Sequence, residues 1–115
     1  PPGTVSGVIS YAGPAAGPGR PLAIAVYRTL PPQGPPLRTA LIDDYAFPYH
    51  FTFDGLEPGT YYVGALIDVD RTDRRYVGML NPARAPHGYA EGGAPIVVSR
   101  LRGVAGVNVE LEATP

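Results

Sequence analysis

Three aspartates at close spacing are the residues of this 115-residue chain best suited to chemistry. Asp68 and Asp70 are two positions apart, so on an extended strand they share a face, and Asp73 can turn back toward them. Carboxylate oxygens are hard ligands of the kind that Ca²⁺ prefers in proteins. The spacing therefore predicts a calcium site formed by Asp68, Asp70 and Asp73.

A salt-bridged loop is the alternative interpretation of the same segment. Arg71, Arg74 and Arg75 crowd the turn and supply one guanidinium group for each carboxylate. The pattern also departs from an EF-hand loop, which needs Gly at the position that Asp73 occupies. Exposed ion pairs of this kind stabilise a protein by only about 0–1 kcal/mol each. We favour the salt-bridged loop and keep Ca²⁺ as the one candidate cofactor.

The two histidines do not form a catalytic or metal-binding motif. His50 and His87 lie in separate segments, and neither belongs to an HxH or HExxH pattern. His50 alternates with Tyr49 and Phe51, so we expect it to face solvent while those aromatics face the core. No serine stands on a nucleophile-elbow sequence. These patterns predict a protein that is not an enzyme.

The aromatic residues allow a binding surface. The chain has eight Tyr and three Phe but no Trp. Exposed aromatic side chains stack on sugars or anchor protein partners. The candidate binding residues are Tyr62, Tyr76, His87 and Tyr89, near the ends of expected strands and loops. The alternative, which we favour for most of the tyrosines, is that they pack the rim of a sheet.

Charge and composition exclude several classes of partner. A net charge of -1 and a pI near 6.1 provide no clustered basic surface for nucleic acid. No apolar run approaches the roughly 20 residues of a membrane-spanning helix, so we expect no direct membrane insertion. With no Cys, neither disulfides nor thiolate chemistry are available. The length indicates a single domain over residues 1–115, and the start at Pro1-Pro2-Gly3 suggests a processed chain.

Short alternating apolar runs, separated by Gly and Pro, predict strands throughout the chain. The longest alternation covers 61–69 and follows the turn at Pro58-Gly59. Leu22–Arg28 is apolar on both faces, which favours a strand inside a sheet that is covered on both sides or closely flanked. Asn81–Pro95 is expected to be a long loop. Further strands are expected at Thr4–Tyr11, Leu37–Ile42, Pro48–Phe53, Tyr76–Met79, Ile96–Ser99 and Val104–Leu111. The pattern predicts an all-β, seven- to eight-stranded antiparallel Greek-key sandwich.

Several of these segments resemble a known family. The most specific is Gly55-Leu56-Glu57-Pro58-Gly59-Thr60-Tyr61, supported by Val5–Tyr11, Ile24–Tyr27 and Val107–Leu111. Together they resemble the prealbumin-like (transthyretin-like) β-sandwich, and more narrowly the carboxypeptidase-regulatory-like modules of bacterial secreted and surface proteins. The resemblance covers nearly the whole chain and implies a seven-stranded sandwich that lacks catalysis.

The resemblance also sets expectations for function. It implies an accessory, structural or adhesion-type module that is extracellular, periplasmic or attached to the cell envelope of a bacterium, with a protein or a surface glycan as its partner. Two alternatives stay open. One is a calcium-stabilised module held by the aspartates. The other is a carbohydrate-binding domain appended to a hydrolase, which depends on the tyrosines.

Overall fold

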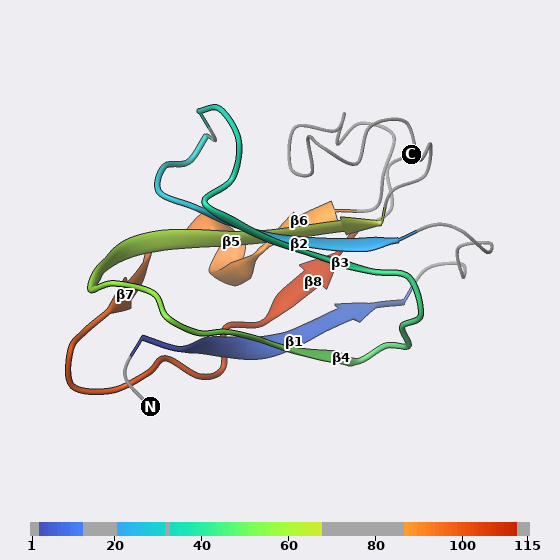
Figure 1. The fold of residues 1–115 in the computed structure, drawn as a ribbon. Helices are drawn as coiled ribbons and strands as arrows, with labels where there is room; N and C mark the ends of the chain where they lie inside the picture. The colour runs from blue at the N-terminus through green and yellow to red at the C-terminus, as the bar shows by residue number, and fades with distance from the viewer. Residues whose placement is uncertain (1–2, 13–20, 32, 68–86, 113–115) are drawn as a thin grey trace.

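Two β-sheets packed face to face form the computed structural model, which describes residues 3–12, 21–31, 33–67 and 87–112 (Figure 1). A short 3₁₀ turn, η2 (Ala90–Gly93), lies between the sixth and seventh strands. The strands are β1 (Val5–Tyr11), β2 (Leu22–Tyr27), β3 (Arg38–Ile42), β4 (Tyr49–Phe53), β5 (Gly59–Ile67), β6 (His87–Tyr89), β7 (Ile96–Val98) and β8 (Val109–Leu111). This all-β organisation in two sheets is consistent with the predicted sandwich.

The sheets differ in size and in the direction of one pair of strands. The smaller sheet has the order β4-β1-β8 and the larger one β3-β2-β5-β6, with β7 paired to the start of β5. Every strand pair is antiparallel except β1 with β8, which is parallel. The expectation of antiparallel pairing throughout is therefore wrong for this pair. Tight turns force antiparallel pairing only on strands that follow one another closely, whereas β1 and β8 come from opposite ends of the chain.

The core fills the space between the sheets, and the strand alternation explains its composition. In β5, the side chains of Tyr61, Val63, Ala65 and Ile67 are all buried, as the odd-numbered positions of the sequence pattern predict. Burying an aliphatic or aromatic side chain of this size contributes about 1.5–3 kcal/mol. Facing residues of β1, β4 and β8 complete the cluster, among them Val5, Ile9, Phe51, Phe53, Val109 and Leu111.

β2 is buried on both of its faces. Leu22, Ile24 and Val26 belong to the core between the sheets. The alternate residues Ala23 and Ala25 point to the outer face of the larger sheet, and they are buried as well. The prediction that this strand lies inside a sheet, covered on both sides or closely flanked, is confirmed by its burial and by its position between β3 and β5. Because the outer face of a two-layer structure usually meets water, this burial marks the outer face of the larger sheet as unusual.

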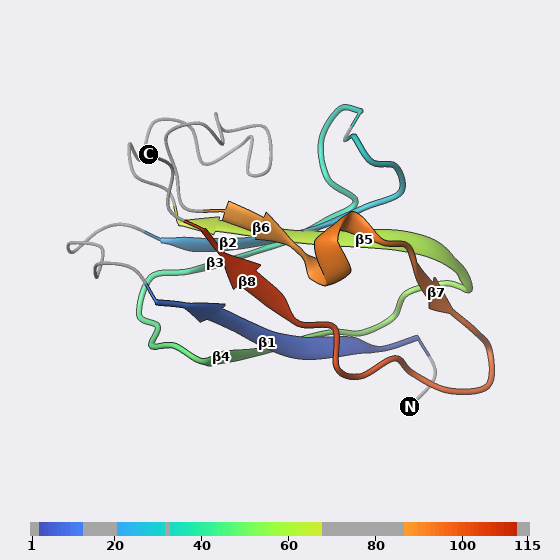
Figure 2. The ribbon, with the colours of Figure 1, turned by 180° about the vertical axis from the view of Figure 1, so that it is seen from behind.

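Along one side of the molecule, the segment around β8 joins the two sheets (Figure 2). A Cβ added to Gly7 in β1 would lie 1.8 Å from the carbonyl oxygen of Val107, and one on Gly88 in β6 would lie 2.3 Å from that of Glu110. The His87 N–H donates to the Glu112 carbonyl at 3.1 Å, and the Glu112 N–H donates back at 2.9 Å. These contacts close that side, and β3 and β4 form the outer strands at the other.

Two segments differ from the sequence expectations. The loop expected over Asn81–Pro95 is wrong at β6, because the edge of β5 pairs with a three-residue segment that has no apolar alternation of its own. The strand expected over Val104–Leu111 is confined to its end. Gly106 has φ +73°, which interrupts the extended run, and Val104 makes only an isolated bridge to Val5. The strand expected at Tyr76–Met79 lies outside the described residues.

Candidate functional site

Three of the four predicted binding residues lie on one surface, the outer face of the larger sheet. In the strand register, Tyr89 is opposite Gly64, His87 is opposite Leu66, and Tyr62 is opposite Tyr27. Residues two apart on a strand share a face, so these side chains all point away from the core. We call Tyr27, Tyr62, His87 and Tyr89 the tyrosine face.

Tyr27 is the member of the tyrosine face that sequence reasoning missed. It is buried, whereas Tyr62, His87 and Tyr89 are each half-buried. The available signal was its parity within the apolar segment Leu22–Arg28, which places it on the face opposite to Val26. Its pairing with Tyr62, however, depends on the register between β2 and β5.

A glycine positions one of the rings. A Cβ added to Gly64 would lie 2.9 Å from the Cδ1 and Cε1 atoms of the Tyr89 ring. The Tyr89 ring therefore rests against the backbone of β5, in the space that a side chain at residue 64 would fill. An aromatic ring lying across a glycine of the neighbouring strand is a known way to stabilise a sheet at such a position.

Burial raises the pKa of two tyrosines of this face, Tyr27 and Tyr89. It raises the pKa of Tyr27 to about 12, and negative charge on Tyr89 adds to that rise. Burial raises the pKa of Tyr89 as well. Both phenols are therefore neutral at physiological pH, and each hydroxyl can donate and accept a hydrogen bond. The phenols of Tyr27 and Tyr89 therefore give the tyrosine face neutral, amphipathic groups of a kind that suits a sugar or a protein partner.

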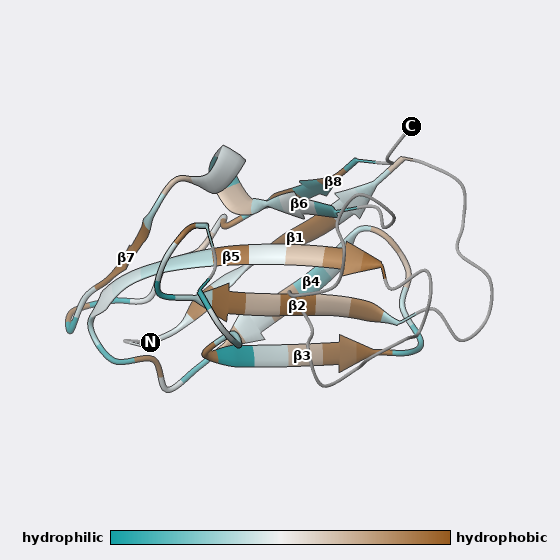
Figure 3. Ribbon diagram, turned by 90° about the horizontal axis from the view of Figure 1, so that it is seen from above, coloured by the Kyte–Doolittle hydropathy of each residue, from teal (hydrophilic) through white to brown (hydrophobic). Residues whose placement is uncertain are grey.

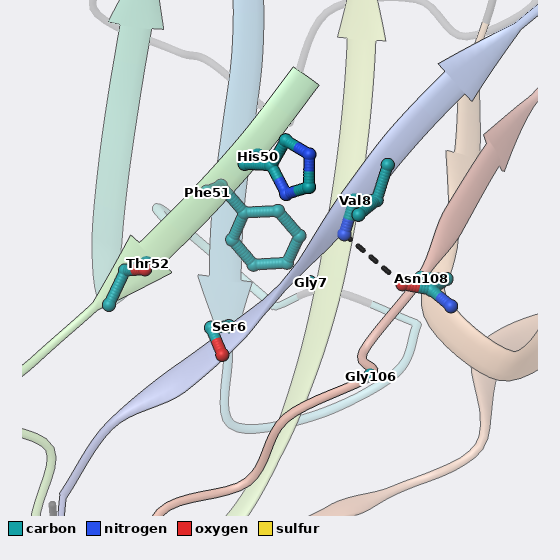
Figure 4. A pocket seen from close by; sticks show the side chains of 8 residues that line it. All are labelled: Ser6, Gly7, Val8, His50, Phe51, Thr52, Gly106 and Asn108. Atoms are coloured by element: carbon teal, nitrogen blue, oxygen red, sulfur yellow. Dashed lines mark hydrogen bonds between the residues drawn. The ribbon is translucent and has the colours of Figure 1, made fainter. Parts of the chain in front are cut away.

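A second candidate site is a shallow hollow of about 370 Å³ on the outer face of the smaller sheet (Figure 4). Its side chains come from β1, from β4 and from the segment that leads into β8. Cross-strand pairing brings Ser6 opposite Thr52 and Val8 opposite His50. The residues that line it are Ser6, Gly7, Val8, His50, Phe51, Thr52, Gly106 and Asn108.

Asn108 is the most clearly oriented polar group of the hollow. The Val8 N–H donates to its Oδ1 at 3.1 Å, which turns the Nδ2 donor of the amide away from β1 (Figure 4). The Ser6 and Thr52 hydroxyls each donate and accept. The hollow thus offers hydroxyl and amide groups with no carboxylate among its lining residues, which suits a neutral molecule rich in hydroxyl groups. Sequence reasoning missed it because the approach of Asn108 to β1 follows from the parallel β1–β8 pair.

The two histidines lie in different sheets. His50 is exposed on β4 of the smaller sheet, as the sequence predicts, and His87 is on β6 of the larger sheet. Each lies on the outer face of its own sheet, so the two side chains point away from each other. The remaining predicted site residues, Asp68, Asp70, Asp73 and Tyr76, lie outside the described residues.

Two searches of the described residues found nothing. No group of three or more His, Asp and Glu side chains that could hold a metal ion occurs within residues 3–12, 21–31, 33–67 and 87–112. In the same part of the chain, no helix is long and apolar enough to span a membrane.

Comparison of the chain with protein-family models, with curated proteins and with solved structures finds no match. The tyrosine face and the hollow are therefore interpreted from their own geometry.

Proposed function

We propose that this chain is a non-catalytic, prealbumin-like accessory module of a secreted or cell-envelope bacterial protein. In this proposal the module contacts a protein partner or a surface glycan through the tyrosine face. The family and the location come from the sequence resemblance, and two sheets of short strands fit the sandwich that the resemblance implies. The contact surface comes from the arrangement of the tyrosines.

One observation carries the proposal: Tyr62, His87 and Tyr89 converge on the outer face of two adjacent strands. All three are half-buried, so each ring is held by its neighbours and still presents part of its surface. Aromatic groups held in this way lose little conformational entropy on binding, and they dominate the energetics of many interfaces. Scattered, fully exposed charged side chains would lose more entropy on binding and contribute less energy to an interface.

The test is affinity electrophoresis through gels that contain soluble glycans, together with cross-linking of the purified protein to a cell-envelope extract. We expect Tyr62→Ala and Tyr89→Ala each to weaken retention or cross-linking by about fivefold or more, because truncating an aromatic anchor costs more than about 1 kcal/mol. Thr52→Ala, on the other sheet, is the matched control and should bind like the unaltered chain. Equal losses for the tyrosine and threonine variants would contradict the proposal.

Carbohydrate binding through the hollow is a second candidate. Hydroxyl and amide side chains lining a hollow without carboxylates are the observation that favours it. If this candidate is correct, Asn108→Ala and Thr52→Ala will reduce retention in a glycan gel while Tyr62→Ala and Tyr89→Ala leave it unchanged. The same set of variants therefore separates the two proposals.

Calcium binding by Asp68, Asp70 and Asp73 stays a prediction from the sequence. Thermal unfolding in EDTA and in millimolar Ca²⁺ tests it. A site with a Kd of about 10 μM adds roughly 2.7 kcal/mol at 1 mM calcium and raises the unfolding midpoint by several degrees. That increase should disappear in Asp70→Asn. Superimposable curves would favour the salt-bridged loop.

A further inference from the structure

The outer edge of β3 is exposed. In the described part of the chain β3 pairs with β2 alone, and Figure 3 shows it as the outermost strand of the larger sheet beside β2. An edge strand presents backbone N–H and C=O groups that can pair with another strand. Proteins usually protect such edges with charged residues or proline. The four residues from Thr39 to Ile42 carry neither, so β3 itself has no such protection over most of its length.

Apolar side chains accompany this edge. Leu37 is 44 % exposed and Leu41 is 40 % exposed. They are two of the four exposed large hydrophobic residues in the described ranges. Leu41 lies within β3, on the outer face of the larger sheet together with Thr39, and Leu37 directly precedes the strand. The other two, Val97 and Leu101, belong to β7 and the turn after it.

The two ends of β3 carry opposite charges, so two copies of the strand that run antiparallel would match in charge. Arg38 begins the strand, and Asp44 lies two residues beyond its end, just after Asp43. When two copies of such a strand run antiparallel, the basic start of one meets the acidic end of the other. Within its own chain, Arg38 donates from Nη1 to the Asp54 carbonyl oxygen at 2.8 Å, and its Nη2 lies 3.9 Å from the Asp54 carboxylate. Its side chain is nevertheless 41 % exposed.

We propose that a second copy of this chain pairs with β3, strand against strand, around a two-fold axis at Ala40. Of the symmetric registers, the one centred on Ala40 pairs all five residues of β3. It sets Thr39 opposite Leu41 of the other copy and Arg38 opposite Ile42, with Asp44 diagonally adjacent to Arg38. The two larger sheets then form one continuous sheet in the order β6-β5-β2-β3-β3-β2-β5-β6.

This dimer does not depend on what the tyrosine face binds, so it goes beyond the proposed function. Strands of five residues on each side bury little area, and we expect the interface to fall below about 1,200 Å². A contact of that size is weak and depends on concentration. It would suit a module that assembles when it is crowded on a surface.

Sedimentation velocity over about 10–500 μM protein is the first test. We expect the mean mass to rise toward that of a dimer. Leu41→Lys places like charges beside each other in the dimer and should raise the dissociation constant at least tenfold. Val97→Lys removes a more exposed apolar residue elsewhere, at 65 % exposure, and should leave the dissociation constant unchanged. A monomer at every concentration, or equal effects of both variants, would overturn the proposal.

Single cysteines test the register, because the chain has no cysteine of its own. In the proposed dimer the two copies of residue 40 are directly opposite each other, with their Cβ atoms about 4.5–5.5 Å apart. A disulfide needs a Cβ separation of about 3.5–4.5 Å, which a small shift of the strands would provide. Ala40→Cys should therefore form a covalent dimer with oxidised glutathione, and Thr39→Cys should do so at least tenfold more slowly. Equal rates, or a faster reaction of Thr39→Cys, would overturn the register and with it the proposed dimer.

Discussion

The outer faces of the two sheets are built differently, although both belong to the same two-layer fold. On the larger sheet the outer side chains of β2 are Ala23, Ala25 and Tyr27, all buried, and Tyr62 and Tyr89 lie on β5 and β6 beside them. On the smaller sheet the outer side chains of β4 are His50 and Thr52, and both are exposed. An antiparallel sheet with one face in water normally alternates apolar and polar residues, which is the pattern of β4.

This difference is the reason for placing the proposed contacts on the larger sheet. The core between the sheets accounts for only one apolar face of each strand, so a second apolar face on β2 is not required by the two-layer packing. The same sheet carries the tyrosine face and the exposed edge of β3. The smaller sheet carries the polar hollow. The predictions below test this division, beginning with the largest expected effect.

An aspartate placed on each outer face should give the largest difference in stability between the two sheets. Ala25 on β2 is 3 % exposed and points to the outer face of the larger sheet. Ala25→Asp places an unpaired carboxylate there, and we expect it to lower the free energy of unfolding by about 3–5 kcal/mol. Thr52→Asp on the smaller sheet should change it by less than about 0.5 kcal/mol. Urea unfolding measures both, and similar losses would show that the two faces do not differ.

Two glycines provide the next comparison. Gly7→Ala brings a methyl group against the Val107 carbonyl, which is backbone, so β1 and the segment before β8 must separate. We expect a loss of about 3 kcal/mol in the free energy of unfolding. At Gly64→Ala the close contact, at 2.9 Å, is with the Tyr89 side chain, and the nearest backbone atom, the Gly88 carbonyl oxygen, is at an ordinary 3.5 Å, so this change should cost about 1 kcal/mol. A larger loss for Gly64→Ala would mean that the ring is fixed more firmly than the backbone contact.

Alkaline pH should weaken the fold through Tyr27. Its pKa is raised from 10.0 to about 12, so the folded state keeps the proton at pH values where the unfolded state has lost it. The stability that this proton contributes is present below pH 10 and is lost as the pH rises toward 12. Tyr27→Phe should flatten the decline in the free energy of unfolding between pH 10 and 12. An unchanged slope would contradict the burial of Tyr27.

Tyr89 should modulate the ionisation of Tyr27. Since charge on Tyr89 raises the pKa of Tyr27, Tyr89→Phe should lower that pKa toward its ordinary value. Tyrosinate absorbance near 295 nm follows the titration. His50→Ala on the other sheet is the control and should leave the titration as it is. A shift with His50→Ala and none with Tyr89→Phe would place the two tyrosines apart.

The smallest expected effect is on the smaller sheet. Asn108→Ala removes the acceptor of the Val8 N–H at an exposed position, where water can replace it. We expect a loss of about 0.5–1 kcal/mol in the free energy of unfolding. Chemical denaturation measures it, and a loss above about 2 kcal/mol would show that the hollow is a structural element of the fold.

The parts of the fold that the sequence predicts are those that depend on the local order of side chains. The burial of β2 on both faces and the alternation of β5 follow from the local order of side chains. The same parity predicts that Tyr62 points away from the core. β6 could not be predicted, because His-Gly-Tyr has no apolar alternation and pairs only where the edge of β5 receives it.

The hollow could not be predicted because it is assembled from both ends of the chain. Asn108 meets Val8 only through the parallel pairing of β1 with β8, and neither segment indicates that direction. Local patterns state which side chains point inward. They do not state which distant strand becomes a neighbour.

Amide chemical-shift mapping of the ¹⁵N-labelled protein, titrated with a glycan that retains it in affinity electrophoresis, tests the account most directly. The tyrosine face predicts that perturbed amides gather at residues 62–66 and 87–89, with those of β1 and β4 unchanged. Perturbations confined to Ser6, Val8, Thr52 and Asn108 would place the ligand in the hollow and contradict the assignment of binding to the larger sheet.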